Sequence, residues 1–149
     1  GLLLVDLPVS AAESLLALTQ PRDIDVIFLV APTTTDRRIA AICEHSSGYL
    51  YYVSLKGVTG AAISDTGEIA GRVAGLRAQT ELPIMVGFGI KDNASALAMA
   101  AVSDGVIVGS ALVQKIGELS DTDSREASLI ADKTALIAAI RQALDSKPA

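Results

Sequence analysis

Three glycine turns, each placed directly after a short apolar run, are the strongest candidates for chemistry in this sequence. They span residues 57–60, 87–89 and 109–110. Glycine allows backbone N–H groups to approach a ligand closely, and N–H groups at the start of a helix carry a partial positive charge. We therefore expect Gly89, Gly109 and Ser110 to hold one phosphoryl group without help from Lys or Arg. The alternative is that these glycines only form tight turns between strands and helices.

The first glycine turn has the composition of a lid. Gly57 and Gly60 bracket Val58 and Thr59, and glycines at both ends of a short segment can act as hinges that close over a site and exclude water. The hydroxyl of Thr59 can then bond a catalytic carboxylate or the substrate. The same composition also fits an ordinary surface loop.

Few other side chains offer chemistry. Asp6 follows an apolar run and can accept a hydrogen bond or contact a partner chain, although an Asp before Leu-Pro is also an ordinary turn residue. Tyr51 and Phe88 flank the same glycine turns and suit an aromatic or apolar ligand, and both also suit a core. With one His and one Cys, a transition-metal site is not expected, and no second carboxylate accompanies Asp6 at the expected site.

A regular alternation of strands and helices must position these residues. The pattern predicts strands over residues 2–5, 26–30, 49–53, 84–86 and 105–108, and helices over residues 11–19, 36–45, 67–79, 94–102, 110–116 and 125–144. Ser10 and Glu13 have capping-box spacing at the first helix, and residues 91–93 cap a later one. This alternation predicts a parallel sheet wrapped by helices, with the carboxyl ends of the strands sharing one edge.

Two architectures fit this alternation within a single domain, residues 1–149. One is an open doubly wound sheet, and the other is part of a (β/α)8 TIM barrel. A whole barrel needs roughly 200 residues or more, so the five strand–helix units would form the C-terminal part of one. The chain begins at Gly1 and enters a strand at once, which we interpret as a piece of a longer protein cut on its N-terminal side.

Composition narrows the class of protein further. The net charge of −5 disfavours a nucleic-acid partner, which would require clustered Lys and Arg. No apolar run is long enough to cross a membrane. Cys43 is the one cysteine, so no internal disulfide can form, and a reducing cytoplasm is the expected location.

Several motifs resemble the tryptophan synthase alpha-chain family, in which they belong to barrel strands four to eight and the loops that follow. In order along the chain they are LLVDLP at 3–8, FLVAPT at 28–33, GYLYYVS at 48–54 followed by GVTGA at 57–61, VGFGI at 86–90, and VGSA at 108–111. The resemblance implies a partial TIM barrel of strands four to eight with their helices. It also implies retro-aldol cleavage of indole-3-glycerol phosphate to indole and glyceraldehyde 3-phosphate in tryptophan biosynthesis.

The resemblance further implies roles for individual residues. The phosphate would be bound by Gly60, Gly89, Gly109 and Ser110. The indole pocket would be lined by Leu3, Leu29, Tyr51, Phe88 and Ile107. Thr59 would sit in the lid and orient a catalytic carboxylate, and Asp6 would contact the indole nitrogen region or relay the state of the site to a partner.

The same resemblance implies a partner and a missing part. Indole would pass to a beta chain that carries pyridoxal phosphate, in a heterotetramer, and the alpha chain itself would need no cofactor. The acid–base pair of the family, a Glu on strand two and an Asp on the loop after it, would lie upstream of Gly1. We therefore expect the isolated chain to be inactive, because the cleavage needs both an acid and a base.

Two other interpretations stay open on the sequence alone. One is another phosphate-binding barrel enzyme of histidine or tryptophan biosynthesis, for which the lid sequence would be unexpected. The other is a non-catalytic half barrel that binds a phosphorylated ligand or a partner chain through its open sheet edges.

Overall fold

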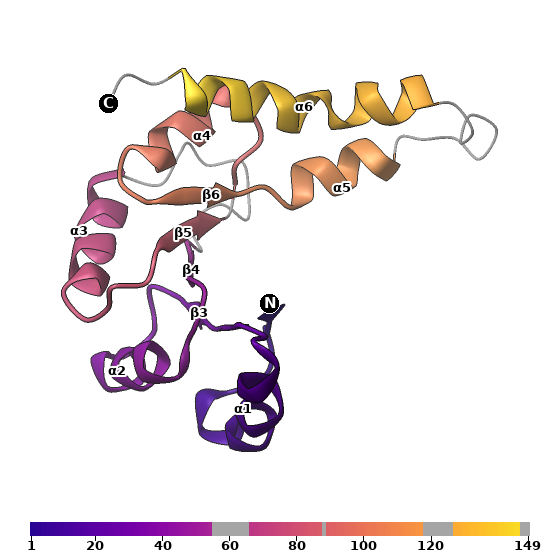
Figure 1. Ribbon diagram of the computed structural model, residues 1–149. Coiled ribbons are helices and arrows are strands. Elements are labelled where there is room, and N and C mark those ends of the chain that lie inside the picture. Colours follow the sequence, from indigo (N-terminus) through magenta and orange to yellow (C-terminus); the bar gives the residue numbers. More distant parts are fainter. Residues whose placement is uncertain (55–65, 88, 118–126, 147–149) are drawn as a thin grey trace.

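A computed structural model describes residues 1–54, 66–87, 89–117 and 127–146 of the chain, with residues 127–133 described by their backbone alone. The strands are β1 (Leu2–Leu3), β2 (Val26–Ile27), β3 (Leu29–Val30), β4 (Leu50–Val53), β5 (Ile84–Gly87) and β6 (Gly105–Ile107). The α-helices are α1 (Glu13–Thr19), α2 (Asp36–His45), α3 (Thr66–Arg77), α4 (Asn93–Ala100), α5 (Ser110–Gly117) and α6 (Ala127–Asp145). Short 3₁₀ turns, η1 (Val9–Ala11) and η2 (Gln20–Arg22), flank α1 (Figure 1).

The described strands are parallel and follow one another in sequence order. β1 pairs with β2, and β3, β4, β5 and β6 form a second run of neighbours. Connections between parallel strands are almost always right-handed, so strands added in one direction place all of their helices on the same face. That is the arrangement of a (β/α)8 barrel, whereas a doubly wound sheet reverses its strand order. The doubly wound alternative is therefore wrong.

The strand expected over residues 26–30 is divided between two neighbours. β2 pairs with β1, and β3 pairs with β4 on the other side, with Phe28 between them. The carbonyl oxygen of Phe28 still accepts a hydrogen bond from the N–H of Tyr51, at 3.2 Å. One extended segment thus joins the two ladders, and the expected strands at 2–5, 26–30, 49–53, 84–86 and 105–108 are all present.

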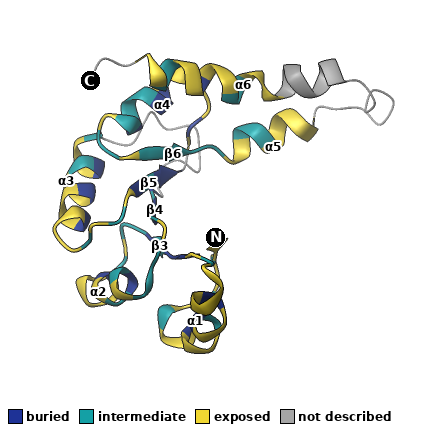
Figure 2. Cartoon of the chain, in the orientation of Figure 1, coloured by how far each residue is buried: buried dark blue, intermediate teal, exposed yellow. Residues whose placement is uncertain are grey.

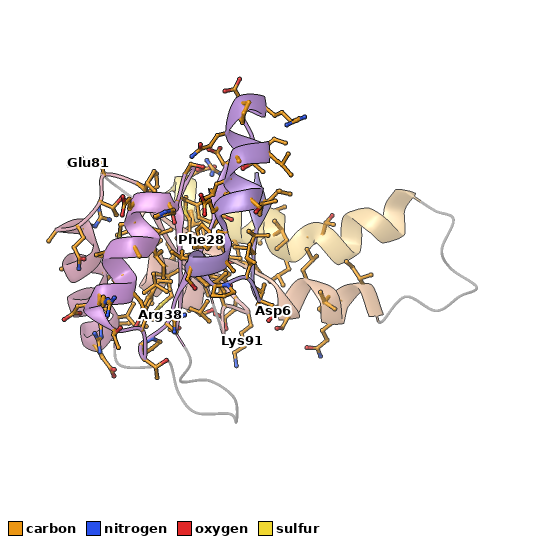
Figure 3. All side chains as sticks on the ribbon, turned by 90° about the horizontal axis from the view of Figure 1, so that it is seen from below. Asp6, Phe28, Arg38, Glu81 and Lys91 are labelled. Carbon is orange, nitrogen blue, oxygen red and sulfur yellow. The ribbon has the colours of Figure 1, made fainter. Side chains whose placement is uncertain are left out.

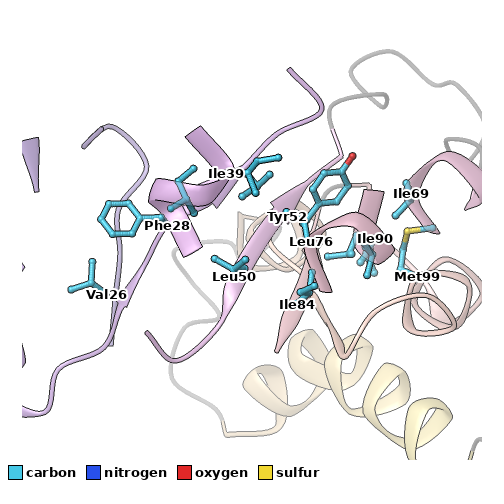
Figure 4. Packing of buried hydrophobic residues seen from close by; sticks show 14 of the residues in the cluster. Val26, Phe28, Ile39, Leu50, Tyr52, Ile69, Leu76, Ile84, Ile90 and Met99 are labelled. Atoms are coloured by element: carbon cyan, nitrogen blue, oxygen red, sulfur yellow. The ribbon is translucent and has the colours of Figure 1, made fainter. Parts of the chain in front are cut away.

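The two faces of the sheet differ in what covers them. The outer face carries Leu50, Tyr52, Ile84 and Val86, which are all buried against the helices in the main apolar cluster (Figure 4). Fully burying such a side chain contributes about 1.5–3 kcal/mol to folding, so this cluster holds the helices in place. The residues that alternate with them form what we call the inner face, namely Leu29, Tyr51, Val53, Met85, Gly87, Gly105 and Ile107.

The two ends of the described structure leave apolar side chains in solvent. Leu2 and Leu3 on β1 are 40% and 41% exposed, and Val113 and Ile116 on α5 are 68% and 50% exposed. In Figure 2 exposed residues mark both the β1–α1 end and the outer side of α5. These are the surfaces that a closed barrel would cover.

One expected helix start is wrong. Ser10 and Glu13 do not form a capping box, because residues 9–11 form the turn η1 and Ala12 occupies the N-cap position of α1 without a side-chain bond. No described helix is long and apolar enough to cross a membrane.

Candidate site at the carboxyl ends of the strands

The inner face carries an apolar surface built around Tyr51. Tyr51 pairs directly with Leu29 on the neighbouring strand. Its ring lies against the backbone of Gly87, where an added Cβ would collide with the ring and hydroxyl of Tyr51. Gly87 in turn pairs with Ile107 on β6. Leu29, Tyr51 and Ile107 are each half-buried and together form one continuous surface.

The other residues expected in the pocket are placed less centrally. Leu3 pairs with Ile27, which precedes Leu29 by two residues on the same extended segment, so Leu3 shares the inner face. Phe88, Thr59 and Gly60 lie outside the described residues. The lid expected over residues 57–60 is therefore not part of this description.

The inner face of the described strands offers a hydrogen-bond donor but no carboxylate. Burial, with a smaller contribution from Tyr49, raises the pKa of Tyr51, so its hydroxyl stays protonated at neutral pH and can donate a hydrogen bond. None of the described strands contains Asp or Glu. Within the described ranges no three His, Cys, Asp or Glu side chains are grouped as a metal ion would need.

The two later glycine turns lie side by side. The last paired residues of β5 and β6 are Gly87 and Ile107, and Gly89 and Gly109 each follow two residues later. Gly89 and Gly109 are both exposed. Gly89 has φ of +71°, which L side chains rarely adopt, and nothing lies within 4 Å of an added Cβ. Backbone conformation rather than crowding thus requires glycine at this position.

The N-terminus of α5 has backbone N–H groups that make no hydrogen bond within the helix. The carbonyl oxygen of Gly109 accepts hydrogen bonds from the N–H groups of Leu112 and Val113, at 3.0 and 3.1 Å. The N–H groups of Ser110 and Ala111 precede these first intrahelical bonds, so they are the orphan donors of this helix start. Ser110 is exposed. Such a start favours an anion such as a phosphoryl group.

The neighbouring helix start is already occupied by its own side chains. Asp92 accepts a hydrogen bond from the N–H of Ser95 at 2.8 Å, and the Ser95 hydroxyl accepts from the N–H of Asp92 at 3.2 Å and from that of Lys91 at 3.1 Å. The bonds from the Ser95 side chain and backbone hold the pKa of Asp92 below its usual value. An anion is therefore favoured at α5 and disfavoured at α4.

The carboxyl edge of the strands also carries charged side chains. Figure 3 places Asp6, Arg38 and Lys91 along one edge of the molecule and Glu81, which precedes β5, at the opposite edge. Asp6 lines a cavity of about 600 Å³ between residues 4–10 and α2. The outer-face core residue Phe28 also lines this cavity, which therefore differs from the surface around Tyr51.

A parallel, sequence-ordered set of strands with helices on one face defines part of a (β/α)8 barrel. The family model described as tryptophan synthase alpha chain matches residues 1–143, and the chain belongs to that family.

Relatives and solved structures agree with the family model. The alpha chain of Marinobacter nauticus is 52% identical over 98% of this chain and 53% of its own length. A crystal structure of the alpha subunit from Legionella pneumophila has a TM-score of 0.79 at 38% identity, covering 97% of this chain and 52% of the other. Tryptophan synthase from M. tuberculosis, in an aminoacrylate-bound form, has a TM-score of 0.77 at 32% identity, covering 97% and 50%. The chain thus spans about half the length of the relatives it matches.

Proposed function

We propose that this chain supplies the phosphate subsite and part of the indole pocket of a tryptophan synthase alpha subunit, which cleaves indole-3-glycerol phosphate to indole and glyceraldehyde 3-phosphate. The observation that carries this proposal is the short path from Tyr51 to the start of α5. The Tyr51 ring covers Gly87, Gly87 pairs with Ile107, and Ser110 follows Ile107 by three residues. A small molecule that carries both an aromatic ring and a phosphoryl group would place the ring on the inner face and the phosphate at the start of α5.

The described groups have distinct roles in this proposal. Leu29, Tyr51 and Ile107 bury the indole ring against an apolar surface. The N–H groups of Ser110 and Ala111, with the Ser110 hydroxyl, hold the phosphate at the N-terminus of α5. In the same proposal, Gly89 and Gly109 shape the turns beside the phosphate, and Gly60 adds a further phosphate contact. Leu3 and Phe88 complete the pocket for the indole ring.

The cleavage also needs groups that this chain does not place on its strands. An acid must protonate the indole ring carbon while a base removes a proton from the glycerol hydroxyl. Because the described strands carry no carboxylate, both groups come from the part of the relatives that this chain does not match. Thr59 positions one of them from the lid. The isolated chain therefore binds without cleaving.

A partner receives the product. The beta chain, which holds pyridoxal phosphate, takes up indole, and the alpha subunit uses no cofactor. Asp6 lies at the carboxyl edge but beside the outer-face residue Phe28. This position suits a contact that reports to a partner better than a contact with the ring on the inner face.

The test is to complete the barrel. The part of the Marinobacter nauticus chain that this chain does not match is fused ahead of residues 1–149, and indole release from indole-3-glycerol phosphate is measured. The fusion should release indole, and the unfused chain should not. In the fusion, Ser110→Ala should raise KM about fivefold or more, because it removes one hydrogen bond to a charged group.

The matched control is Ser14→Ala, which changes an exposed serine on α1 and should leave KM unchanged. Indole release by the unfused chain would contradict the assignment of the acid and base. Phosphate binding by a fusion that never releases indole would favour the non-catalytic half barrel instead.

A further inference from the structure

The cavity beside Asp6 has features of a binding site in its own right. It has a volume of about 600 Å³ and lies between residues 4–10 on one wall and the first turns of α2 on the other. Its apolar lining comes from both walls and from the strand segment between them, and it includes Leu4, Leu7, Val9, Phe28, Leu29 and Ile42. Cavities of this size with mostly apolar walls and a few polar groups are typical of small-molecule sites.

Three charged side chains border this apolar lining. Asp6 belongs to the first wall, and Arg37 and Arg38 belong to α2. All three are exposed. No hydrogen bond or ion pair joins any of their side chains to another residue in the described part of the chain. The cavity therefore presents a carboxylate on one side and two guanidinium groups on the other, each without a protein partner among the described residues.

We propose that this cavity binds a small organic monocarboxylate with an apolar body and an O–H or N–H donor at its far end. Guanidinium groups bind carboxylates through paired N–H···O bonds, so Arg37 and Arg38 take the anionic end. The Asp6 carboxylate accepts from the donor at the other end. The apolar body lies over Phe28 and its neighbours.

Charge and geometry select this class over two others. The bordering groups sum to one positive charge, which a monocarboxylate neutralises, whereas a phosphomonoester carries about −1.5 to −2 at pH 7. An α-amino acid carries its donor and its carboxylate on one carbon, but Asp6 and the arginines belong to opposite walls. A ligand with separated ends satisfies both walls at once.

The site is separate from the proposed catalytic surface. Of the residues that form the surface around Tyr51, only Leu29 also lines this cavity. Ser110 and Gly89 do not line it. A compound bound between Asp6 and Arg38 therefore leaves the phosphate subsite free, and the two can be measured independently.

The probe is 3-(4-hydroxyphenyl)propanoate, titrated into the 149-residue chain and followed by isothermal titration calorimetry. We expect saturable binding at one site with Kd below about 1 mM. Arg37→Gln/Arg38→Gln should weaken binding about tenfold or more, because it removes the charge-assisted bonds. Arg22→Gln changes an exposed arginine of the turn η2 that does not line the cavity; it is the matched control and should leave Kd unchanged.

A second probe tests the donor end. 3-Phenylpropanoate lacks the phenolic O–H and should bind the native chain about threefold to tenfold more weakly. That difference should disappear in Asp6→Ala, which removes the accepting carboxylate oxygens. The proposal is overturned by the absence of saturable binding, or by unchanged affinity in the double arginine variant. Loss of binding in Ile107→Ala with retention in the double arginine variant would place the probe on the inner face and would also overturn it.

Discussion

The ring of Tyr51 fills the space that a side chain at position 87 would need, so Gly87 is kept as glycine by its neighbour and not by its own backbone conformation. This relationship joins β4 to β6 across the inner face, because Gly87 pairs with Ile107. It makes the apolar surface continuous. The candidate pocket for the ring therefore requires glycine at position 87, where a side chain would displace Tyr51.

Gly87→Ala should displace the Tyr51 ring and lower the free energy of unfolding by about 1–3 kcal/mol, as overpacking does. Urea unfolding measures the change. Gly75→Ala is the matched control, because nothing lies within 4 Å of its added Cβ on α3, and it should stabilise by about 0.5–1 kcal/mol. If Tyr51 is responsible, Tyr51→Leu/Gly87→Ala will cost less than the sum of the two single changes. Additive costs would refute that relationship.

Gly89→Ala should cost about 1–2 kcal/mol, because φ of +71° places its Cβ close to the following carbonyl oxygen. Gly109 is not among the glycines with positive φ, so Gly109→Ala should cost much less. Chemical denaturation of the two variants in parallel makes the comparison. Equal costs at the two positions would mean that the turn after β5 is not held in this conformation.

Asp104 links α3, β5 and the start of β6 at the edge of the sheet opposite the carboxyl ends of the strands. Its carboxylate accepts hydrogen bonds from the N–H of Ile84 and from Arg77, each at 2.8 Å. Burial raises the pKa of Asp104, but the Ile84 and Arg77 contacts outweigh it and lower the pKa below 3.8. The stabilisation is therefore present above that pH and is lost as the pH falls through the lowered pKa.

Asp104→Ala should lower stability at pH 6 by about 1–3 kcal/mol, because it leaves the N–H of the buried residue Ile84 without its partner. Asp104→Asn should reduce the loss of stability between pH 6 and pH 3. Asp145→Asn, which removes the exposed pair with Arg141, is the control and should change stability by less than about 0.5 kcal/mol. The same pH dependence in native chain and Asp104→Asn would contradict this role.

The helix cap at α4 should contribute to the free energy of unfolding, whereas the serine expected to cap α1 should not. Asp92→Ala should cost about 1 kcal/mol, since it removes the bond from the Ser95 N–H. Ser10→Ala should cost close to nothing, because α1 has no side-chain cap bond. Thermal unfolding of both variants tests the contrast, and a large effect at Ser10 would restore the capping box there.

The strands could be predicted from the sequence more reliably than the starts of the helices. Apolar runs between helical patterns are enough to predict each strand in the described part of the chain, because buried parallel strands have that composition. The sequence predicts a capping box at Ser10 and a cap within residues 91–93, and only the first is wrong, because the turn η1 places Ala12 at the N-cap position of α1. The spacing of capping residues in the sequence does not determine the backbone conformation of the segment that precedes the helix.

Some features of the candidate site could be predicted from the sequence, and others depend on the fold. The glycine turns were visible as motifs, and the pocket residues were named by resemblance to the family. The cover of Gly87 by Tyr51 had no signal in the sequence, since it depends on the register between β4 and β5. The cavity between Asp6 and Arg38 also had none, because exposed charges on separate segments are ordinary until the fold brings them together.

The most direct measurement is a titration of the isotope-labelled chain with inorganic phosphate, followed through backbone amide chemical shifts. The amides of Gly89, Ser110 and Ala111 should move together and saturate, while those of Asp92 and Ser95 stay in place. Saturating shifts at the start of α4 instead of α5, or shifts at Ser110 without Gly89, would contradict a phosphate subsite shared by these neighbouring strand ends.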